Sequence, residues 1–350
     1  DEVDKGFSHL PPGCHIQLDR IAKERILDSL KEACNNSWRN LAKELSSYTA
    51  LAGTSRTSMV DFLKDTGYDL SDLYSGSGNA PRGWTALRRK AGLLRDPGGE
   101  HEEAISAKMS NLLGWNDPSL IEGVMQVAEK PNEYDDSESS MNILAAELFP
   151  APKDPCTGSE LTARLSNEPF IREEMKQLGD LLLDDSQIVP EKVSGCPEDW
   201  PFLLHGRYGV RSIAMGTGKT SPDNRHFPRE GVIRFPEQKI EILLVTLDKS
   251  TGFKETTAYH DYAISSELFH WQTQNSASPD TGAGKRYCPG LSDGWKFMMF
   301  VRENKETLYG FLGEATSVKV EGSKPMSITF ELSMQMPSQM FERFSVLRAV

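Results

Sequence analysis

The sequence predicts an α+β protein, with a helical region at the N-terminus and a mainly β domain at the C-terminus. Two observations predict this class. In the first half, apolar residues recur every three or four positions, which is the spacing of one face of a helix. From about Pro201 the pattern changes to short apolar or alternating runs, which are typical of strands. Because no regular helices separate these runs, a compact barrel or half-barrel is expected.

The expected helices follow that spacing. The stripe Leu18, Ile21, Ile26 and Leu30 predicts a helix near the N-terminus, and Trp38, Leu41 and Leu45 continue it. Further helices are predicted at Met59–Leu63, Leu70–Tyr74, Trp84–Leu93, Met141–Phe149 and Leu161–Leu183. Residues 131–140 are acidic and polar and residues 150–159 are proline-rich, so both are expected to be linkers or exposed loops. We therefore predict a helical region over 1–150, linker and helices over 151–200, and the β domain over 201–350.

The expected strands lie at Val232–Phe235, Ile240–Leu247, Lys296–Arg302, Leu308–Leu312 and Ser327–Leu332. The run Ile240–Leu247 is almost continuously apolar, as in a strand that is covered on both faces. In the last strand, Ile328, Phe330 and Leu332 alternate with polar residues, so one face is expected to be buried.

Charge and cysteine content limit the functional classes. The formal net charge is −12, which argues against unspecific coating of DNA but allows a local basic surface. The five cysteines are scattered and form no C-x-x-C pair, so neither a disulfide framework nor a zinc finger is expected. With no long apolar run, no membrane association is expected, and we expect a reducing, cytoplasmic location. The sequence begins with Asp1 rather than Met, as expected of part of a longer protein.

The sequence contains only partial matches to known catalytic motifs. The run Met215–Thr220 lacks the first glycine of a phosphate-binding loop, because Ile213 stands there. Glu237 and Lys239 are the nearest match to the Glu-x-Lys pair of a metal-dependent nuclease, with Asp223 as the nearest preceding acid, but they precede their strand instead of lying within it. We therefore expect no catalytic residues and no metal site in this chain.

A basic helical segment is a candidate DNA contact. Three short helices with tight turns, ending at Trp84–Leu93, resemble a helix-turn-helix arrangement. Arg82, Arg88 and Arg89 lie in or beside the third helix, where they could reach phosphates or base edges. The simpler alternative is a solvated basic face on a small helical bundle.

The segment Tyr259–Pro279, with Tyr287 further on, carries the most chemical information. Aromatic rings can stack on a base, and the amides of glutamine and asparagine can pair with a base edge. We predict a base pocket from these residues: Tyr259, His260, Tyr262, Phe269, Trp271, Gln272, Gln274, Asn275 and Tyr287. The alternative is that Tyr262, Phe269 and Trp271 belong to the core and that His260 and Asp261 form a polar pair.

These blocks also carry a family resemblance. Tyr259–Pro279, the flanking Val245–Ser250, Phe300–Glu303 and Glu321–Ile328 resemble a helicase-associated C-terminal domain family of formerly unknown function. The opening Leu10–Arg20, Asp61–Leu63 and Trp84–Arg89 resemble the segment that follows the motor in the same proteins. The resemblance covers most of the chain and is weakest between residues 98 and 199.

The resemblance implies a function for this chain. In that family a phospholipase-D-type nuclease and a superfamily 2 helicase precede this region, and some members resemble ATP-dependent type IV restriction enzymes. It therefore implies that this chain recognises double-stranded DNA with modified cytosine, by base flipping in a fold like the SRA or PUA half-barrels. ATP and Mg²⁺ would act in the upstream helicase and nuclease modules, and this chain needs no cofactor.

Three hypotheses follow. The first is DNA recognition, with phosphates held by Arg207, Arg211, Lys219, Arg225, Arg229, Lys285, Arg286 and Lys324. The second is a module that couples the motor to the nuclease or forms a homodimer, without reading bases. The third is a cryptic nuclease that uses Glu237 and Lys239.

Overall fold

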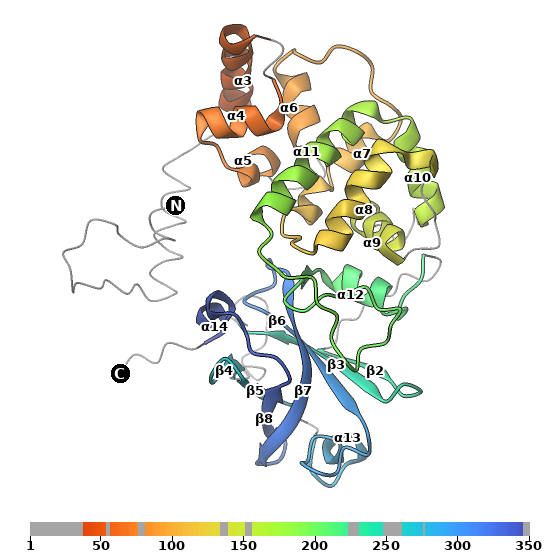
Figure 1. Cartoon of the computed structure of the whole chain (residues 1–350), viewed down its shortest axis with the longest axis vertical. Helices are drawn as coiled ribbons and strands as arrows, with labels where there is room; N and C mark the ends of the chain where they lie inside the picture. The colour runs from red at the N-terminus through yellow and green to blue at the C-terminus, as the bar shows by residue number, and fades with distance from the viewer. Residues whose placement is uncertain are drawn as a thin grey trace, which may run out of the picture.

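The computed structural model of the chain describes residues 38–53, 57–75, 81–133, 139–150, 156–222, 231–247, 261–275 and 277–345. Within these residues, a group of helices is followed by an eight-stranded mixed sheet (Figure 1). The predicted α+β class is confirmed. The helix predicted from the stripe Leu18 to Leu30 lies outside the described residues.

Helices make up the first half of the described chain. They are α3 (Trp38–Ala52), α4 (Met59–Thr66), α5 (Leu70–Tyr74), α6 (Trp84–Lys90), α7 (Glu102–Ser106), the 3-10 turn η2 (Met109–Leu112), α8 (Pro118–Glu129), the 3-10 turn η3 (Pro131–Glu133), α9 (Ser139–Leu148), α10 (Gly158–Ser166) and α11 (Pro169–Asp185). The predicted helix Leu161–Leu183 is wrong in one respect, because it is two helices. Pro169 has no amide hydrogen to donate, so it begins α11 as the first helical residue instead of continuing α10.

Side chains at the helix starts explain several of these boundaries. Ser58 accepts a hydrogen bond from the amide of Asp61, and Gly67 ends α4 in the left-handed conformation at φ 75°. Thr157 and Glu160 form a reciprocal capping box at the start of α10. These local signals are present in the sequence, and they set both ends of α4 and the start of α10.

The carboxylate of Glu174 holds the helical half together. Glu174 lies on α11 and is fully buried. It accepts hydrogen bonds from the hydroxyl of Tyr74 (2.7 Å) and from the amides of Trp84 (2.9 Å) and Thr85 (2.8 Å). It therefore serves as the cap of α6 from another helix, since Gly83 at the N-cap position has no side chain to offer.

The sheet contains strands β1 to β8, and a short helix precedes it. The elements are β1 (Arg207–Tyr208), α12 (Val210–Gly216), β2 (Val232–Phe235), β3 (Ile240–Thr246), β4 (Tyr262–Ala263), β5 (Leu268–Gln272), α13 (Gly282–Lys285), β6 (Lys296–Arg302), β7 (Tyr309–Glu321), β8 (Ser327–Leu332) and α14 (Ser338–Phe344). The strand order is β2-β3-β6-β7-β8-β5-β4, and β1 pairs with β7. Only the β3–β6 pair among these is parallel. The sheet is open, with β2 and β4 at its edges.

The strand predictions are largely confirmed. Val232–Phe235, Lys296–Arg302 and Ser327–Leu332 are strands with the predicted bounds. The strand predicted at Leu308–Leu312 is much longer, because β7 runs from Tyr309 to Glu321 and passes irregularities in its pairing with both neighbours.

Both faces of the central strands are buried. One face of β3, β6 and β7 contributes Ile242, Phe300 and Phe311 to a core that also contains the helices, and Phe300 stacks on Phe311 with centroids 4.4 Å apart. The other face contributes Leu243, Met299 and Leu312 to a second core, which includes β5, β8 and α14. Double coverage explains why the run Ile240–Leu247 lacks the alternation of an exposed strand.

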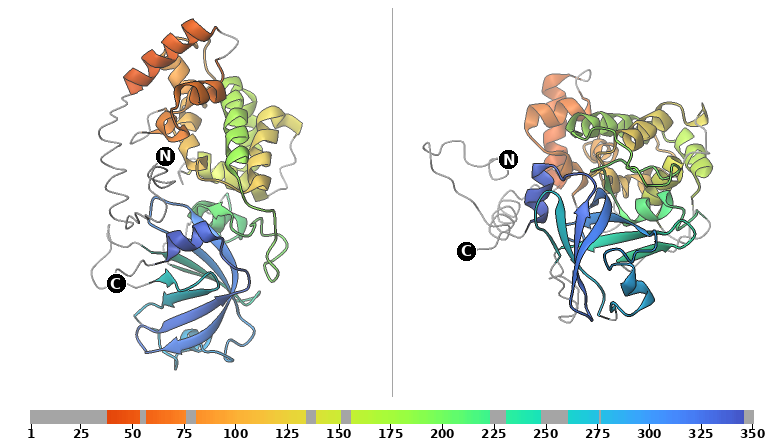
Figure 2. Two further views of the ribbon diagram at one scale, coloured as in Figure 1. Left: turned by 60° about the vertical axis from the view of Figure 1, so that its left-hand side comes forward. Right: turned by 60° about the horizontal axis from the view of Figure 1, so that its bottom comes forward.

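The helical half and the sheet therefore meet over one continuous core, and Figure 2 shows them stacked end to end. Asp117, the cap of α8, accepts a hydrogen bond from the hydroxyl of Tyr208 at 2.5 Å. Its neighbour Asn116 accepts one from the amide of Arg207 at 2.7 Å. The domain limits at 150 and 200 stay predictions, since packed residues from both sides share this core. None of the helices in the described ranges is long and apolar enough to cross a membrane.

Candidate nucleic-acid interface

Strand β5 positions the centre of the predicted base pocket. It pairs with β8 on one side and with the two-residue strand β4 on the other. Its side chains alternate, so that Phe269 and Trp271 point into the core while His270 and Gln272 lie on the partly exposed face. One strand thus divides the predicted pocket residues between two faces of the sheet.

Three of the predicted stacking rings are buried. Phe269, Trp271 and Tyr287 are 0%, 7% and 2% exposed, and Trp271 packs edge-on against Tyr287 with centroids 5.3 Å apart. The expectation that these rings line an open cavity is therefore corrected: they form part of the second core. Burial of large aromatic surface stabilises the sheet, and alternation along β5 leaves Phe269 and Trp271 no other face.

The opposite face of β5 carries a different aromatic pair. The rings of Tyr262 and His270 stack with centroids 4.9 Å apart and an interplanar angle of 19°, and both residues are half-buried. Gln272 follows on the same face; its amide group donates to the hydroxyl of Ser327 at 3.3 Å. The buried Asp261 accepts a hydrogen bond from the backbone amide of Gln272 at 2.8 Å, which fixes the end of the strand.

Beyond Gln272 the chain enters a tip whose described residues are 273–275, 277–285 and the β7–β8 turn. Thr273 and Met326 exchange hydrogen bonds, and the amide of Lys324 donates to the carbonyl of Ala277 at 3.0 Å. Lys324, in the left-handed region at φ 57°, is thereby held beside the loop. Four predicted DNA contacts on this tip are exposed to solvent: Gln274, Asn275, Lys285 and Lys324. We call these residues the tip group.

The predicted phosphate contact Arg286 has a structural partner. Its guanidinium lies 2.9 Å from the carboxylate of Glu241, which is fully buried on β3 and also meets Arg234 at 3.3 Å. The hydroxyl of Tyr287 donates to the same carboxylate, and Arg286 lies over the ring of Trp295 at 4.4 Å. A buried carboxylate needs such partners, so the role of Arg286 as a free phosphate contact is corrected. The missed signal was a charged residue inside the apolar run Ile240–Leu247.

The remaining phosphate candidates are distributed over other elements. Arg207 is half-buried on β1, where burial lowers the pKa of its guanidinium. Arg211 pairs with the buried carboxylate of Glu147 at 3.1 Å, and the ammonium group of Lys219 lies 5.8 Å from the ring centroid of Phe235. Arg207, Arg211 and Lys219 therefore have surroundings of their own and do not belong to the tip group. The candidates Arg225, Arg229, Tyr259 and His260 lie outside the described residues.

The predicted basic helix in the first half is mostly neutralised. Arg88 pairs with Glu173 at 3.1 Å, and both Nε and Nη2 of Arg89 bind the carboxylate of Glu102. Helix α6 is seven residues long and buries Trp84, Thr85 and Leu87. Its position in the bundle favours a packing role for α6 over insertion into a DNA groove.

The residues of the nuclease alternative lie in a turn. Glu237 and Lys239 are exposed between β2 and β3, and the ammonium group of Lys239 donates to the carbonyl of Asp293 at 2.8 Å. Asp223 lies outside the described residues. Among the residues that can be described, no three His, Cys, Asp or Glu side chains gather as metal ligands would. The geometry gives this alternative no support.

The second half of the chain is thus an open mixed sheet with exposed polar side chains at one end. Residues 202–344, from just before β1 to the end of α14, match a family described as "Domain of unknown function (DUF3427)". The match covers less than half of the chain and agrees with the resemblance to a helicase-associated C-terminal domain of unknown function. No curated protein matches the chain.

Proposed function

We propose that this chain is the DNA-recognition and coupling part of a larger ATP-driven restriction protein, and that it contacts duplex DNA through the tip group. The observation that carries the proposal is the gathering of Gln274, Asn275 and Lys324, with Lys285 on the same loop, at one exposed end of the sheet. Amide side chains suit base edges and lysines suit phosphates, so this combination can both hold and read a duplex.

Recognition of modified cytosine is the finer part of the proposal. With Phe269, Trp271 and Tyr287 in the core, a flipped base would stack against the half-buried Tyr262–His270 pair, with Gln272 beside it for the base edge. Burial of a single methyl group contributes about 1 kcal/mol. Discrimination of 5-methylcytosine would therefore also depend on the shape of the site and on coupling to the motor.

The coupling alternative has an observation of its own in its favour. The helices and one face of the sheet share one core, so a displacement of either half would be transmitted to the other. A module that only couples partners or dimerises would show no salt-dependent binding to DNA. In either case ATP and Mg²⁺ would be used by helicase and nuclease modules upstream of this chain, in the cytoplasm of a prokaryote.

The test is a binding titration of the chain with labelled duplexes of one sequence that contain cytosine, 5-methylcytosine or 5-hydroxymethylcytosine at one position. We expect salt-dependent binding that is tightest for a modified duplex. The double variant Lys285→Ala/Lys324→Ala should weaken binding to all three and reduce the slope of log affinity against log salt by about 2, since each phosphate contact contributes about 0.9. Gln274→Ala/Asn275→Ala should instead reduce the difference between duplexes.

Lys64→Ala is the matched control, because Lys64 is an exposed lysine on α4, in the helical half of the chain. It should leave affinity and salt dependence unchanged. Equal affinity for the three duplexes would remove modification reading, and absence of binding to any duplex would favour the coupling alternative.

A further inference from the structure

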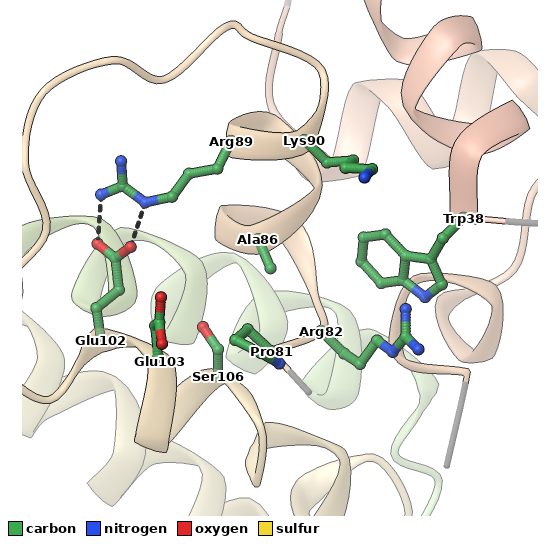
Figure 3. Close-up of a pocket in the computed structure, with 9 residues that line it drawn as sticks. All are labelled: Trp38, Pro81, Arg82, Ala86, Arg89, Lys90, Glu102, Glu103 and Ser106. Atoms are coloured by element: carbon green, nitrogen blue, oxygen red, sulfur yellow. Dashed lines mark hydrogen bonds and ion pairs between the residues drawn. The ribbon is translucent and has the colours of Figure 1, made fainter. Parts of the chain in front are cut away.

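A pocket of about 360 Å³ opens in the helical half, between α3, α6 and α7 (Figure 3). The indole of Trp38 lies on one side, and Glu103 and Ser106 of α7 lie on another. Arg82, just before α6, and Lys90, at its end, also line the pocket. The pocket is separate from the tip group, which lies at the far end of the sheet (Figure 1).

The charges around this pocket are only partly paired. Arg89 and Glu102 neutralise each other across one wall, as the two dashed lines in Figure 3 show. Arg82 is different: its guanidinium lies 4.8 Å from the ring centroid of Trp38, and its buried Nε has no hydrogen-bond partner among the described residues. Lys90 is exposed. Arg82 lines the pocket and has no acidic partner among the described residues, so its guanidinium is available to an anionic ligand there.

We propose that this pocket binds a nucleoside phosphate, either as a free nucleotide or as an unpaired nucleotide within a strand. The phosphate accepts hydrogen bonds from Arg82 and Lys90. The base packs against the indole of Trp38, as bases do on aromatic platforms. Glu103 and the hydroxyl of Ser106 accept hydrogen bonds from an exocyclic amino group of the base.

The residues that line the pocket favour a nucleoside phosphate over a simple polyanion. An acidic peptide would bring carboxylates close to Glu103, which carries no ion pair within the described part of the chain, and it would have no use for the indole. The volume lies near the lower limit of small-molecule sites, which matches one nucleotide and excludes a duplex. This inference does not depend on duplex recognition by the tip group.

The test is calorimetric titration of the whole chain with dAMP, dTMP, adenosine, inorganic phosphate and the single strand dA10. We expect saturable binding of dAMP or of dA10, with phosphate alone and adenosine alone each at least about tenfold weaker. Binding of dA10 without dAMP would identify a strand as the source, and binding of both would identify the nucleotide unit itself. Either result supports the proposal.

Variants assign the binding to this pocket. Lys90→Ala and Arg82→Gln should each weaken binding by about tenfold or more, because each removes a charge-assisted hydrogen bond. Glu103→Gln should reduce the preference for dAMP over dTMP. Arg164→Gln is the matched control, since Arg164 also lies over an aromatic ring, that of Phe149 at 4.4 Å, outside the pocket.

Three results would overturn the proposal: no saturable binding of either dAMP or dA10, affinities unchanged in Lys90→Ala, or binding of inorganic phosphate, or of poly-glutamate titrated in the same way, as tight as that of the tighter of dAMP and dA10. Lys90 is exposed, so its variant is expected to fold even if Arg82→Gln does not. If the tip variants lose duplex binding but still bind the nucleotide, the tip group and the pocket are independent sites.

Discussion

At the scale of single residues, buried carboxylates organise both halves of the molecule. Glu174 caps α6 from α11, and Glu241 holds Arg234 and Arg286 at the sheet. Each is fully buried, and each accepts hydrogen bonds from the donors that surround it. These two side chains fix the positions of the elements from which predicted DNA contacts project.

Replacing Glu174 by alanine should therefore destabilise the fold. The change leaves the hydroxyl of Tyr74 and the amides of Trp84 and Thr85 without their acceptor, and the expected loss in free energy of unfolding is about 3 kcal/mol or more. Urea denaturation measures this loss. Glu173→Ala is the control, because Glu173 is exposed and pairs only at the surface with Arg88 and Gln177; a change below about 1 kcal/mol is expected there. Equal losses in both variants would contradict the capping role.

Residue types alone were a poor guide to the site. Gln274, Asn275 and Lys324 were predicted from their chemistry, and their role stays a prediction; in the structure all three are exposed at one end of the sheet. The sequence could not show that Trp271 and Tyr287 pack against each other. Aromatic residues occur both in cores and in base-binding sites, so the residue type alone does not distinguish the two roles. The acidic partners of Arg286 and Arg88 lie 45 and 85 residues away in the sequence, so no local pattern could indicate these pairs.

At the scale of elements, local pattern predicted several strands well, whereas the regular helix α8 was not predicted and α10 and α11 were predicted as one helix. Lys296–Arg302 and Ser327–Leu332 were predicted with their observed bounds. Strands β4 and β5 were missed because β4 has two residues and β5 mixes polar and aromatic side chains. The order of the strands, with β3 parallel to β6, depends on long-range pairing that no local pattern contains.

The loop that carries Lys285 provides a prediction at this scale. A Cβ added at Gly284 would collide with the carbonyl of Ser278, whereas one added at Gly282 would meet nothing. Gly284→Ala should therefore cost about 1–3 kcal/mol in unfolding free energy and weaken duplex binding by displacing the loop. Gly282→Ala should be neutral or slightly stabilising. Urea denaturation and the duplex titration distinguish the two, and similar behaviour of both variants would show that the packing at Gly284 does not position the loop.

At the scale of the whole molecule, the junction between helices and sheet contains a titratable group. Burial raises the pKa of Asp117, although hydrogen bonds from Tyr208 and from the amides of Leu120 and Ser119 act in the opposite direction. The carboxylic acid of the folded protein therefore takes up its proton at a higher pH than that of the unfolded chain. As pH falls through the folded pKa towards about 3.9, this group contributes increasing stability.

Asp117→Asn tests that contribution, because asparagine retains the capping oxygen of α8 but does not ionise. The wild-type protein should gain stability relative to the variant between pH 7 and pH 4. Urea unfolding of both proteins across this range isolates the effect, since the other carboxylates are common to both. A constant difference across the range would show that Asp117 keeps an ordinary pKa.

Strand β7 begins at Tyr309, where it pairs with β1 near the helices, and ends at Glu321, next to the turn that holds Lys324. At about 3.3 Å per residue, its thirteen residues reach roughly 40 Å. The strand therefore runs from the core that the sheet shares with the helices to the tip. A few degrees of tilt imposed by a molecule bound at the far end would become a displacement of ångström size at Tyr309, inside the core that the sheet shares with the helices.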